Sequence, residues 1–313
     1  MKLDFIRGHM GGNLIILLKG SQIPGGKELE TAIKLLGPNY LYAHEAGILY
    51  PAEGGSALTA KIAEPTVGAF ISACGGFTQV LGVALVETAL GEALGIDYRE
   101  PLTEVLLHTD CGPTRLFIET KDQKAVRIKT DMDCFVRDCY ERGVGVLNYN
   151  GLEVMQAGKF LVINADRFKE VYPQADFTGW NPETRDILIA IQERFENDTG
   201  EIEHNVALYD WNPEHGGDLR AVYPHYLAGD YYEPSCGTGT VALGIAVLAW
   251  KELNGFDRNR AGLIRLKVEC GGGEELGGPD WTDLEIKVEN GRVKTASFSH
   301  SQVEITAVGE AWL

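Results

Sequence analysis

The stretch Pro234-Ser235-Cys236-Gly237-Thr238-Gly239-Thr240 runs directly into a long apolar segment, Val241–Trp250. A glycine-rich turn that opens a helix leaves unpaired backbone N–H groups at its start, and the helix dipole favours negative charge there. A cysteine at such a position forms a thiolate more readily than an ordinary cysteine does. We therefore interpret Cys236 as a reactive thiol that begins a buried helix.

A second copy of this unit lies in the first half of the chain. The stretch Cys74-Gly75-Gly76-Phe77-Thr78 leads into another apolar segment, Gln79–Val86. With the two cysteines aligned, the same residue type recurs at Cys74 and Cys236, Gly75 and Gly237, Thr78 and Thr240, Leu81 and Leu243, Gly82 and Gly244, and Ala84 and Ala246. This repeat predicts two similar domains, each of which contributes one cysteine.

Strand patterns that follow both cysteines extend the repeat. Residues 115–120 and 125–130 alternate as antiparallel strands do, and residues 265–270 and 284–288 match them in turn. We expect an α/β (α+β) protein of two pseudo-symmetric domains. The first domain would hold residues 1–138 and about 297–313, and the second residues 139–296.

Hydrophobic periodicity predicts further elements in both halves. The expected strands cover residues 14–18, 43–51, 56–62, 104–108, 158–163 and 203–209, and the expected helices cover residues 28–36, 74–94 and 181–197. A hairpin turn around Gly54 and Gly55 would join two of these strands. Two last strands, over residues 295–299 and 303–308, are expected to return to the first domain.

The charge balance limits the classes of partner. The chain has 28 Lys and Arg against 45 Asp and Glu, a net charge of −17. Nucleic acids and anionic membranes attract positive proteins, so we expect neither as a partner. Charges and glycines interrupt the N-terminal segment where a secretory signal needs an apolar core, and no segment has the roughly 18 apolar residues of a membrane span. We expect a cytoplasmic protein.

Six cysteines in such a protein should be free thiols. No two of them have the Cys-x-x-Cys spacing that is typical of zinc sites. Cys134 and Cys139 lie near Asp131 and Asp133, but their spacing fits no usual metal motif. We interpret them as packed residues and expect no metal.

Three places in the chain resemble the cofactor-independent racemase and epimerase superfamily that includes diaminopimelate epimerase and proline racemase. They are Arg7–Asn13 before an apolar strand, Cys74-Gly75 at the start of the first helix, and Cys236–Thr240 at the start of the second. The resemblance spans essentially the whole chain. It implies two domains, each a mostly antiparallel sheet rolled around a central helix, with the active site in the cleft between them.

The chemistry that the resemblance implies also follows from the residues. Inversion at an α-carbon needs one group that removes the proton and another that returns one from the opposite face, and Cys74 and Cys236 would supply both. The N–H groups of two helix starts would hold the substrate carboxylate; they belong to Gly75, Gly76, Gly237, Thr238 and Gly239. Such a site needs no cofactor, and its substrate would be a small amino acid or a related carboxylate.

Other candidate residues come from the family pattern. Asn13 matches a substrate-contacting asparagine of the family, and Asn205 is a similar candidate. Glu233 or Asp230 would meet a substrate ammonium group, with a surface carboxylate as the competing interpretation. His44 and His225 lie among tyrosines, where packing or a place in the cleft would account for them. A homodimer is expected from the family alone.

Departures from the family pattern bear on the substrate. Gly76 stands where diaminopimelate epimerases have asparagine and proline racemases have histidine, and Phe77 stands where a glycine is usual. The segment Gly229–Ser235 lacks the arginine that the epimerases use for a distal carboxylate. These differences argue against diaminopimelate as the substrate.

Two other functions stay open from the sequence. The first is an isomerase that shifts a double bond in an unsaturated carboxylate, or a dehydratase, on the same fold. The second is a binding protein that has kept the fold without turnover, which the altered Gly76-Phe77 pair would favour.

Overall fold

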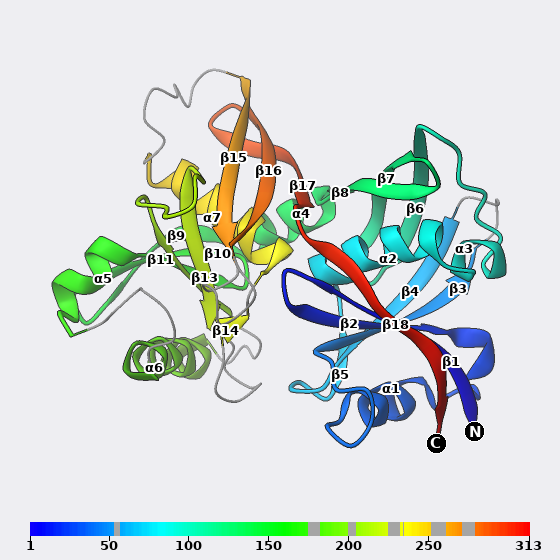
Figure 1. Ribbon diagram of the computed structural model, residues 1–313. Coiled ribbons are helices and arrows are strands. Elements are labelled where there is room, and N and C mark those ends of the chain that lie inside the picture. Colours follow the sequence, from blue (N-terminus) through cyan, green and yellow to red (C-terminus); the bar gives the residue numbers. More distant parts are fainter. Residues whose placement is uncertain are drawn as a thin grey trace. The chain divides into compact units, whose positions relative to one another are not determined.

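The computed structural model describes residues 1–52, 57–174, 182–199, 205–224, 232–233, 235–251, 261–270 and 279–313 (Figure 1). The chain divides into two compact units, one formed by Met1–Cys134 with Ser299–Leu313 and the other by Phe135–Phe298. The expected turn at Gly54-Gly55, and the residues His225 and Asp230, lie outside the described residues.

The first unit is a curled sheet around one helix. Its strands are β1 (Lys2–Met10), β2 (Asn13–Lys19), β3 (Glu45–Pro51), β4 (Ala57–Glu64), β5 (Ala69–Ile71), β6 (Leu102–Thr109), β7 (Gly112–Lys121), β8 (Lys124–Asp131) and β18 (Val303–Trp312). Its helices are the 3₁₀ turn η1 (Gly20–Gln22), α1 (Glu28–Leu36), α2 (Gly75–Glu87) and α3 (Leu90–Ala93).

Strand pairing runs β18–β1–β2–β3–β4–β6–β7–β8. The pairs β2–β3 and β4–β6 are parallel and the others in this run are antiparallel. Helix α2 contacts β18 and β1 toward one end of the run and β7 and β8 at the other, because the sheet wraps around it. Every residue of α2 from Gly75 to Val86 is buried, as expected for a helix with apolar residues on all sides.

The second unit repeats this plan. Its strands are β9 (Val144–Tyr149), β10 (Leu152–Ala157), β11 (Phe160–Asn164), β12 (Asn205–Asp210), β13 (Leu219–Pro224), β14 (Tyr232–Glu233), β15 (Gly262–Cys270), β16 (Asp280–Glu289) and most of β17 (Arg292–His300). Its helices are α5 (Ala165–Val171), α6 (Pro182–Thr199) and α7 (Gly237–Ala249). Helix α4 (Asp133–Arg142) begins at the end of the first unit and continues into the second.

Pairing in the second unit runs β9–β10–β11–β12–β13–β15–β16, with β11–β12 and β13–β15 parallel. This is the order of the first unit with β9 in the place of β18. Helix α7 contacts β9 to β12 and β16, and its residues are buried on all sides. The expected fold, two pseudo-symmetric α+β domains with sheets rolled around central helices, is therefore confirmed.

The strand match that the sequence indicated is shifted by one strand. Strand β15 runs parallel to β13, the strand before the β14–α7 segment, just as β6 runs parallel to β4. Residues 265–270 therefore hold the place of β6 and not of residues 115–120 in β7. The alternation of apolar and polar residues recurs in every strand of such a sheet, so it cannot by itself set which strand matches which.

Small residues let both central helices approach their sheets. A Cβ atom on Gly82 of α2 would lie 2.7 Å from two carbons of Ile128 on β8, and one on Gly244 of α7 would lie 2.7 Å from Leu284 Cδ2 on β16. The matched glycines of the repeat thus perform the same packing role, and a larger residue at either position would push its helix off the sheet.

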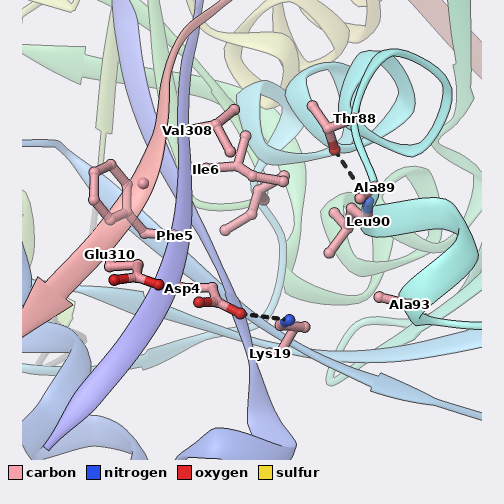
Figure 2. A pocket seen from close by; sticks show the side chains of 12 residues that line it. Asp4, Phe5, Ile6, Lys19, Thr88, Ala89, Leu90, Ala93, Val308 and Glu310 are labelled. Carbon is pink, nitrogen blue, oxygen red and sulfur yellow. Dashed lines mark hydrogen bonds and ion pairs between the residues drawn. The ribbon is translucent and has the colours of Figure 1, made fainter.

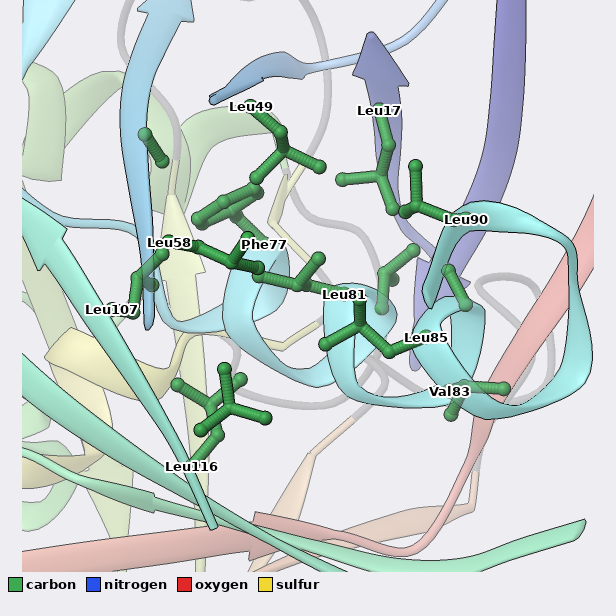
Figure 3. Packing of buried hydrophobic residues seen from close by; sticks show 14 of the residues in the cluster. Leu17, Leu49, Leu58, Phe77, Leu81, Val83, Leu85, Leu90, Leu107 and Leu116 are labelled. Carbon is green, nitrogen blue, oxygen red and sulfur yellow. The ribbon is translucent and has the colours of Figure 1, made fainter. Parts of the chain in front are cut away.

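Figure 3 shows the core that α2 forms in the first unit, where Phe77, Leu81 and Leu85 face Leu49 and other strand residues. All of these side chains are buried. The expected helix over 74–94 is broken, because α2 ends at Glu87 and Thr88 has an extended backbone. The helices α4 and α5 were not expected from periodicity; both are short and mix apolar with charged residues.

None of the helices in the described part of the chain has the length and apolar character that a membrane crossing needs.

Candidate active site

Cys74 is the N-cap residue of α2. Its backbone is extended, with φ −143° and ψ 121°, and its Sγ accepts a hydrogen bond from the backbone N–H of Phe77 at 3.3 Å. Only 8% of the residue is exposed. An N-cap side chain normally satisfies one of the free N–H groups of the first turn, and here a sulfur does so. Negative charge on this sulfur is stabilised by that N–H and by the helix dipole.

Cys236 has the same geometry at the start of α7. Its φ and ψ are −130° and 112°, and its Sγ accepts a hydrogen bond from the backbone N–H of Gly239, again at 3.3 Å. The exposed fraction is also 8%. The hydroxyl of Thr238 lies a further 3.3 Å from this sulfur. The two cysteines that the sequence paired therefore occupy equivalent positions in the two units, each at the start of a buried helix.

Asn13 belongs to the surroundings of Cys74. It begins β2, it is 1% exposed, and its Oδ1 lies 3.2 Å from Nδ1 of His44. A Cβ atom on Gly76 would lie 3.1 Å from Nδ2 of Asn13, so the amide of Asn13 rests against the first turn of α2. The structure thus brings Asn13, His44, Gly76 and Cys74 into one cluster within the first unit.

The ring of His44 has a fixed role in this cluster. Its Nδ1 also lies 3.1 Å from the backbone N of Leu14, which donates to it. A ring nitrogen that accepts from an N–H carries no proton, so the proton of a neutral His44 is on Nε2. The amide of Asn13 has its Oδ1 on the side of this ring and its Nδ2 on the side of Gly76.

Phe77 lies in the core and not at the site. It is fully buried, and a Cβ atom on Gly47 of β3 would lie 2.1 Å from its Cε2. In the second unit Gly239 occupies the matched helix position, and a Cβ atom on it would lie 2.5 Å from Cε1 of Tyr223 on β13. Here the glycine is on the helix and the aromatic residue is on a strand, but that strand, β13, holds the place of β4 and not of β3. Phe77 therefore fills space in the core, and its presence does not indicate which substrate is bound.

The remaining predicted residues differ in how far the structure defines them. Gly237 begins α7, and Thr238 is the half-buried member of its first turn. Asn205 begins β12, is half-buried, and donates its backbone N–H to the carbonyl of Lys159 at 2.8 Å. Glu233 pairs in strand register with Tyr223, but its side chain lies outside the described residues.

A polar network beneath α2 was missed from the sequence. Gln79 donates from Nε2 to Thr130 Oγ1 at 2.8 Å, and its Oε1 accepts the backbone N–H of His300 at 3.2 Å. Thr78 Oγ1 lies 2.8 Å from the same Thr130 hydroxyl. Burial lowers the pKa of His300 to about 4, so its ring is neutral. The only sequence signal was a polar Gln79 inside an otherwise apolar helix.

Two buried groups also lie close to each other in the second unit. Burial raises the pKa of the Cys270 thiol to about 12 and that of the Asp280 carboxyl to about 7. The two residues are paired in register on β15 and β16, and Ser235, which precedes Cys236, hydrogen-bonds to Cys270. At such a pKa Cys270 stays a thiol at neutral pH, which distinguishes it from a reactive cysteine.

A cavity of about 310 Å³ opens elsewhere in the first unit, among β1, β2, β18 and the α2–α3 turn. Figure 2 shows Ile6, Val308 and Leu90 on its walls and the Lys19–Asp4 ion pair, 2.7 Å long, at one side. None of the predicted site residues lines it. Among the residues that the structure describes, no group of three or more His, Cys, Asp or Glu could hold a metal ion.

Comparison with known proteins gives matches only at the level of structure. No protein-family model and no curated protein matches the chain. A hydroxyproline epimerase from Agrobacterium vitis, solved with bound trans-4-hydroxy-L-proline, superposes with a TM-score of 0.63 at 14% identity, over 99% of this chain and 92% of that one. A phenazine biosynthesis protein of the PhzF family from Bacillus anthracis has a TM-score of 0.64 at 12% identity, over the full length of both chains.

A methylitaconate Δ-isomerase is also similar, with a TM-score of 0.59 at 14% identity over 99% of this chain and 95% of that one. The chain thus has the proline racemase/PhzF fold. The superfamily resemblance that the sequence indicated is confirmed for the fold. Identities this low establish no activity, so the function has to be argued from the site.

Proposed function

We propose that this chain is an isomerase, a cofactor-independent racemase or epimerase that inverts the α-carbon of an amino acid with Cys74 and Cys236 as its two acid/base groups. One observation carries the proposal. Both sulfurs cap equivalent buried helices. Each accepts, at 3.3 Å, the backbone N–H of the residue three positions later in the chain, and each cysteine is 8% exposed. Two equivalent bases suit a reaction whose substrate and product are mirror images at one carbon.

In this mechanism one sulfur begins as a thiolate and the other as a thiol. The thiolate removes the α-proton, and the thiol returns a proton from the opposite face of the same carbon. The mechanism requires both sulfurs to reach that carbon. The negative charge that develops on the substrate carboxylate would be stabilised by backbone N–H groups in the first turns of α2 and α7. One well-placed donor of this kind contributes about 3 kcal/mol in the transition state.

Asn13 and Gly76 would form one wall of the substrate site. A side chain at residue 76 would press on the Asn13 amide, because a Cβ atom there would lie 3.1 Å from Asn13 Nδ2. The Nδ2 group of Asn13, which lies on the side of Gly76, would donate a hydrogen bond to the substrate carboxylate. We propose Asn205, Glu233 and Thr238 as further contacts in the second unit.

The substrate class is inferred from a structurally similar protein and from the sequence before Cys236. The structurally similar Agrobacterium vitis epimerase holds trans-4-hydroxy-L-proline, so proline and its hydroxylated forms are the first amino acids to test. The segment before Cys236 has no arginine for a distal carboxylate, which disfavours diaminopimelate. The protein would need no metal and no bound cofactor for this reaction.

A double-bond isomerase is the second candidate, because a methylitaconate Δ-isomerase has the same fold. That reaction also moves a proton next to a carboxylate. It differs in that the proton leaves one carbon and arrives at another, so a single acid/base group can serve both steps.

Proton NMR in D₂O separates the two candidates. The protein is incubated with a panel of L- and D-amino acids and with unsaturated carboxylates, and the α-proton signal is followed together with the enantiomer ratio. Loss of the α-proton with growth of the opposite enantiomer supports the racemase. Conversion of an unsaturated acid without any amino-acid exchange supports the double-bond isomerase.

The cysteines are tested by Cys74→Ser and Cys236→Ser. Serine is a good N-cap residue, so each variant should fold, whereas a hydroxyl is a far weaker base than a thiolate at neutral pH. We expect racemisation to fall by at least about 10²-fold in each variant. Cys139→Ser is the matched control, since Cys139 is buried and burial raises the pKa of its thiol. Unchanged racemisation in both variants would refute the two-thiol mechanism.

A further inference from the structure

Two cysteines outside the proposed active site lie in contact. Cys111 is in the turn between β6 and β7, and Cys134 is in the first turn of α4. Their Sγ atoms are 2.8 Å apart, and Thr114 Oγ1 is 3.4 Å from the sulfur of Cys134. Both cysteines are thiols in the structure, Cys134 is buried, and Cys111 is half-buried.

The placement of this pair favours a bond between the sulfurs. A disulfide joins its sulfurs at about 2.0 Å, so these two need to approach by less than one ångström. Side-chain rotation suffices for such a movement. Since Cys111 is partly open to solvent and Cys134 lies behind it, a small oxidant reaches Cys111 first and Cys134 is in place to resolve the product.

We propose that Cys111 and Cys134 form a redox-active thiol pair that closes to an intramolecular disulfide when a hydroperoxide oxidises the protein. In the first step the Cys111 thiolate attacks one oxygen of hydrogen peroxide, which gives a sulfenic acid and water. In the second step the sulfur of Cys134 attacks the sulfenic sulfur and releases a second water. Two electrons pass from the thiol pair to the peroxide, and both thiol protons end in water.

The other cysteines of the first and second units are placed differently. Cys139 and Cys270 are buried, and burial raises the pKa of both thiols, so little reactive thiolate forms on either. Cys74 and Cys236 each cap a helix, where the sulfur accepts a backbone N–H group. The pair Cys111 and Cys134 combines a partly exposed thiol with a second sulfur in direct contact.

The cross-link would connect two functional parts of the first unit. The backbone N–H of Cys111 donates to the carbonyl of Ser72 at 3.1 Å, and Ser72 lies two residues before the proposed catalytic Cys74. Cys134 lies in the first turn of α4, the helix through which the chain passes from the first unit to the second. A disulfide would fix the β6–β7 turn to the start of that helix.

The test uses the full-length Cys74→Ser/Cys236→Ser protein, so that the proposed catalytic thiols cannot contribute and the result does not depend on the isomerase activity. The protein is treated with a small excess of hydrogen peroxide, alkylated under denaturing conditions, digested and analysed by mass spectrometry. We expect peptides that contain Cys111 and Cys134 to appear joined, with a mass lower by about 2 Da than the two thiol peptides together. Dithiothreitol should restore both thiols.

Variants then assign the sulfurs. Cys111→Ser and Cys134→Ser should each abolish the joined peptides, whereas Cys139→Ser, five residues farther along α4, should leave them unchanged. Oxidation of Cys111 to a sulfinic acid without cross-linking, or no reaction at all, would overturn the proposal. So would a cross-link of either residue to a different cysteine. The peptide map of the Cys74→Ser/Cys236→Ser protein, in which Cys111, Cys134, Cys139 and Cys270 all remain, decides the question even where a further serine variant folds poorly.

Discussion

Phe77 and Gly47 share one space in the core of the first unit. A Cβ atom on Gly47 would lie 2.1 Å from Cε2 of Phe77, a distance that real Cβ atoms do not show. The ring therefore lies directly on the backbone of β3, and Gly47 is required for packing. In the second unit the ring of Tyr223 on β13 lies in the same way on the backbone of Gly239 in α7.

The first prediction tests this relationship by a double-mutant cycle. Gly47→Ala should overpack the site and destabilise the protein by about 1–3 kcal/mol. Phe77→Ala should cost about 3–5 kcal/mol because it leaves a cavity. In the double variant the new methyl group enters part of that cavity, so the loss should be smaller than the sum by about 1 kcal/mol or more. Urea denaturation measures all three free energies of unfolding, and strict additivity would contradict the shared space.

The second prediction concerns the direction of proton transfer. If each cysteine removes the α-proton from one enantiomer only, Cys74→Ser and Cys236→Ser should each stop deuterium exchange for one enantiomer and leave it detectable for the other. The two variants should have opposite preferences. Exchange is followed by proton NMR in D₂O, with each pure enantiomer of the substrate in turn.

This experiment also identifies a one-base mechanism. With a single base, one of the two serine variants would lose exchange with both enantiomers and the other would lose exchange with neither. Such an outcome would assign all proton transfer to one sulfur and leave the other as a helix cap.

The third prediction concerns the contact between Gly76 and Asn13. A methyl group at residue 76 would lie 3.1 Å from Asn13 Nδ2, so the amide has to move by a few tenths of an ångström in Gly76→Ala. We expect a rise in KM, or a loss of kcat/KM of about 10-fold to 10²-fold, with little change in the free energy of unfolding. Gly25→Ala is the matched control, because a Cβ atom there meets no atom within 4 Å. Equal activity of the two variants would exclude Asn13 from the substrate site.

The sequence was sufficient for the fold and for the positions of the two cysteines. Apolar helices that begin with Cys-Gly, small residues at Gly82 and Gly244, and alternating strands each have a local physical cause, and each recurs in the structure. The helix over 28–36 was predicted with the bounds that the structure gives.

Other features depend on contacts that have no local signal. The place of β15 beside β13 is set by which strands hydrogen-bond, and alternation alone does not reveal it. The packing role of Phe77 depends on Gly47 of the neighbouring β3, which is thirty positions earlier in the chain. His44 likewise contacts Asn13, which is some thirty positions earlier in the chain, because β2 and β3 pair in parallel.

The last prediction concerns the acid stability of the first unit. His300 is 8% exposed, its Nδ1 accepts the backbone N–H of Gln302 at 3.0 Å, and burial lowers its pKa to about 4, with His9 adding to the shift. An unfolded chain binds the proton near the ordinary pKa of about 6.5. Between these two values the unfolded state therefore holds more protons than the folded state, and stability falls as the pH falls through this window.

Both the size and the sign of this change in the free energy of unfolding can be measured. The loss attributable to His300 should be about 2 kcal/mol at pH ~5 and about 3 kcal/mol at pH ~4, relative to neutral pH. His300→Asn keeps an acceptor on a short side chain but has no group that titrates in this range. The difference in the free energy of unfolding between the variant and the wild type should therefore shift in favour of the variant by these amounts as the pH falls. A difference that stays constant between pH ~7 and pH ~4 would mean that His300 takes up its proton equally well in the folded state, and that the buried network with Gln79 can hold a charge.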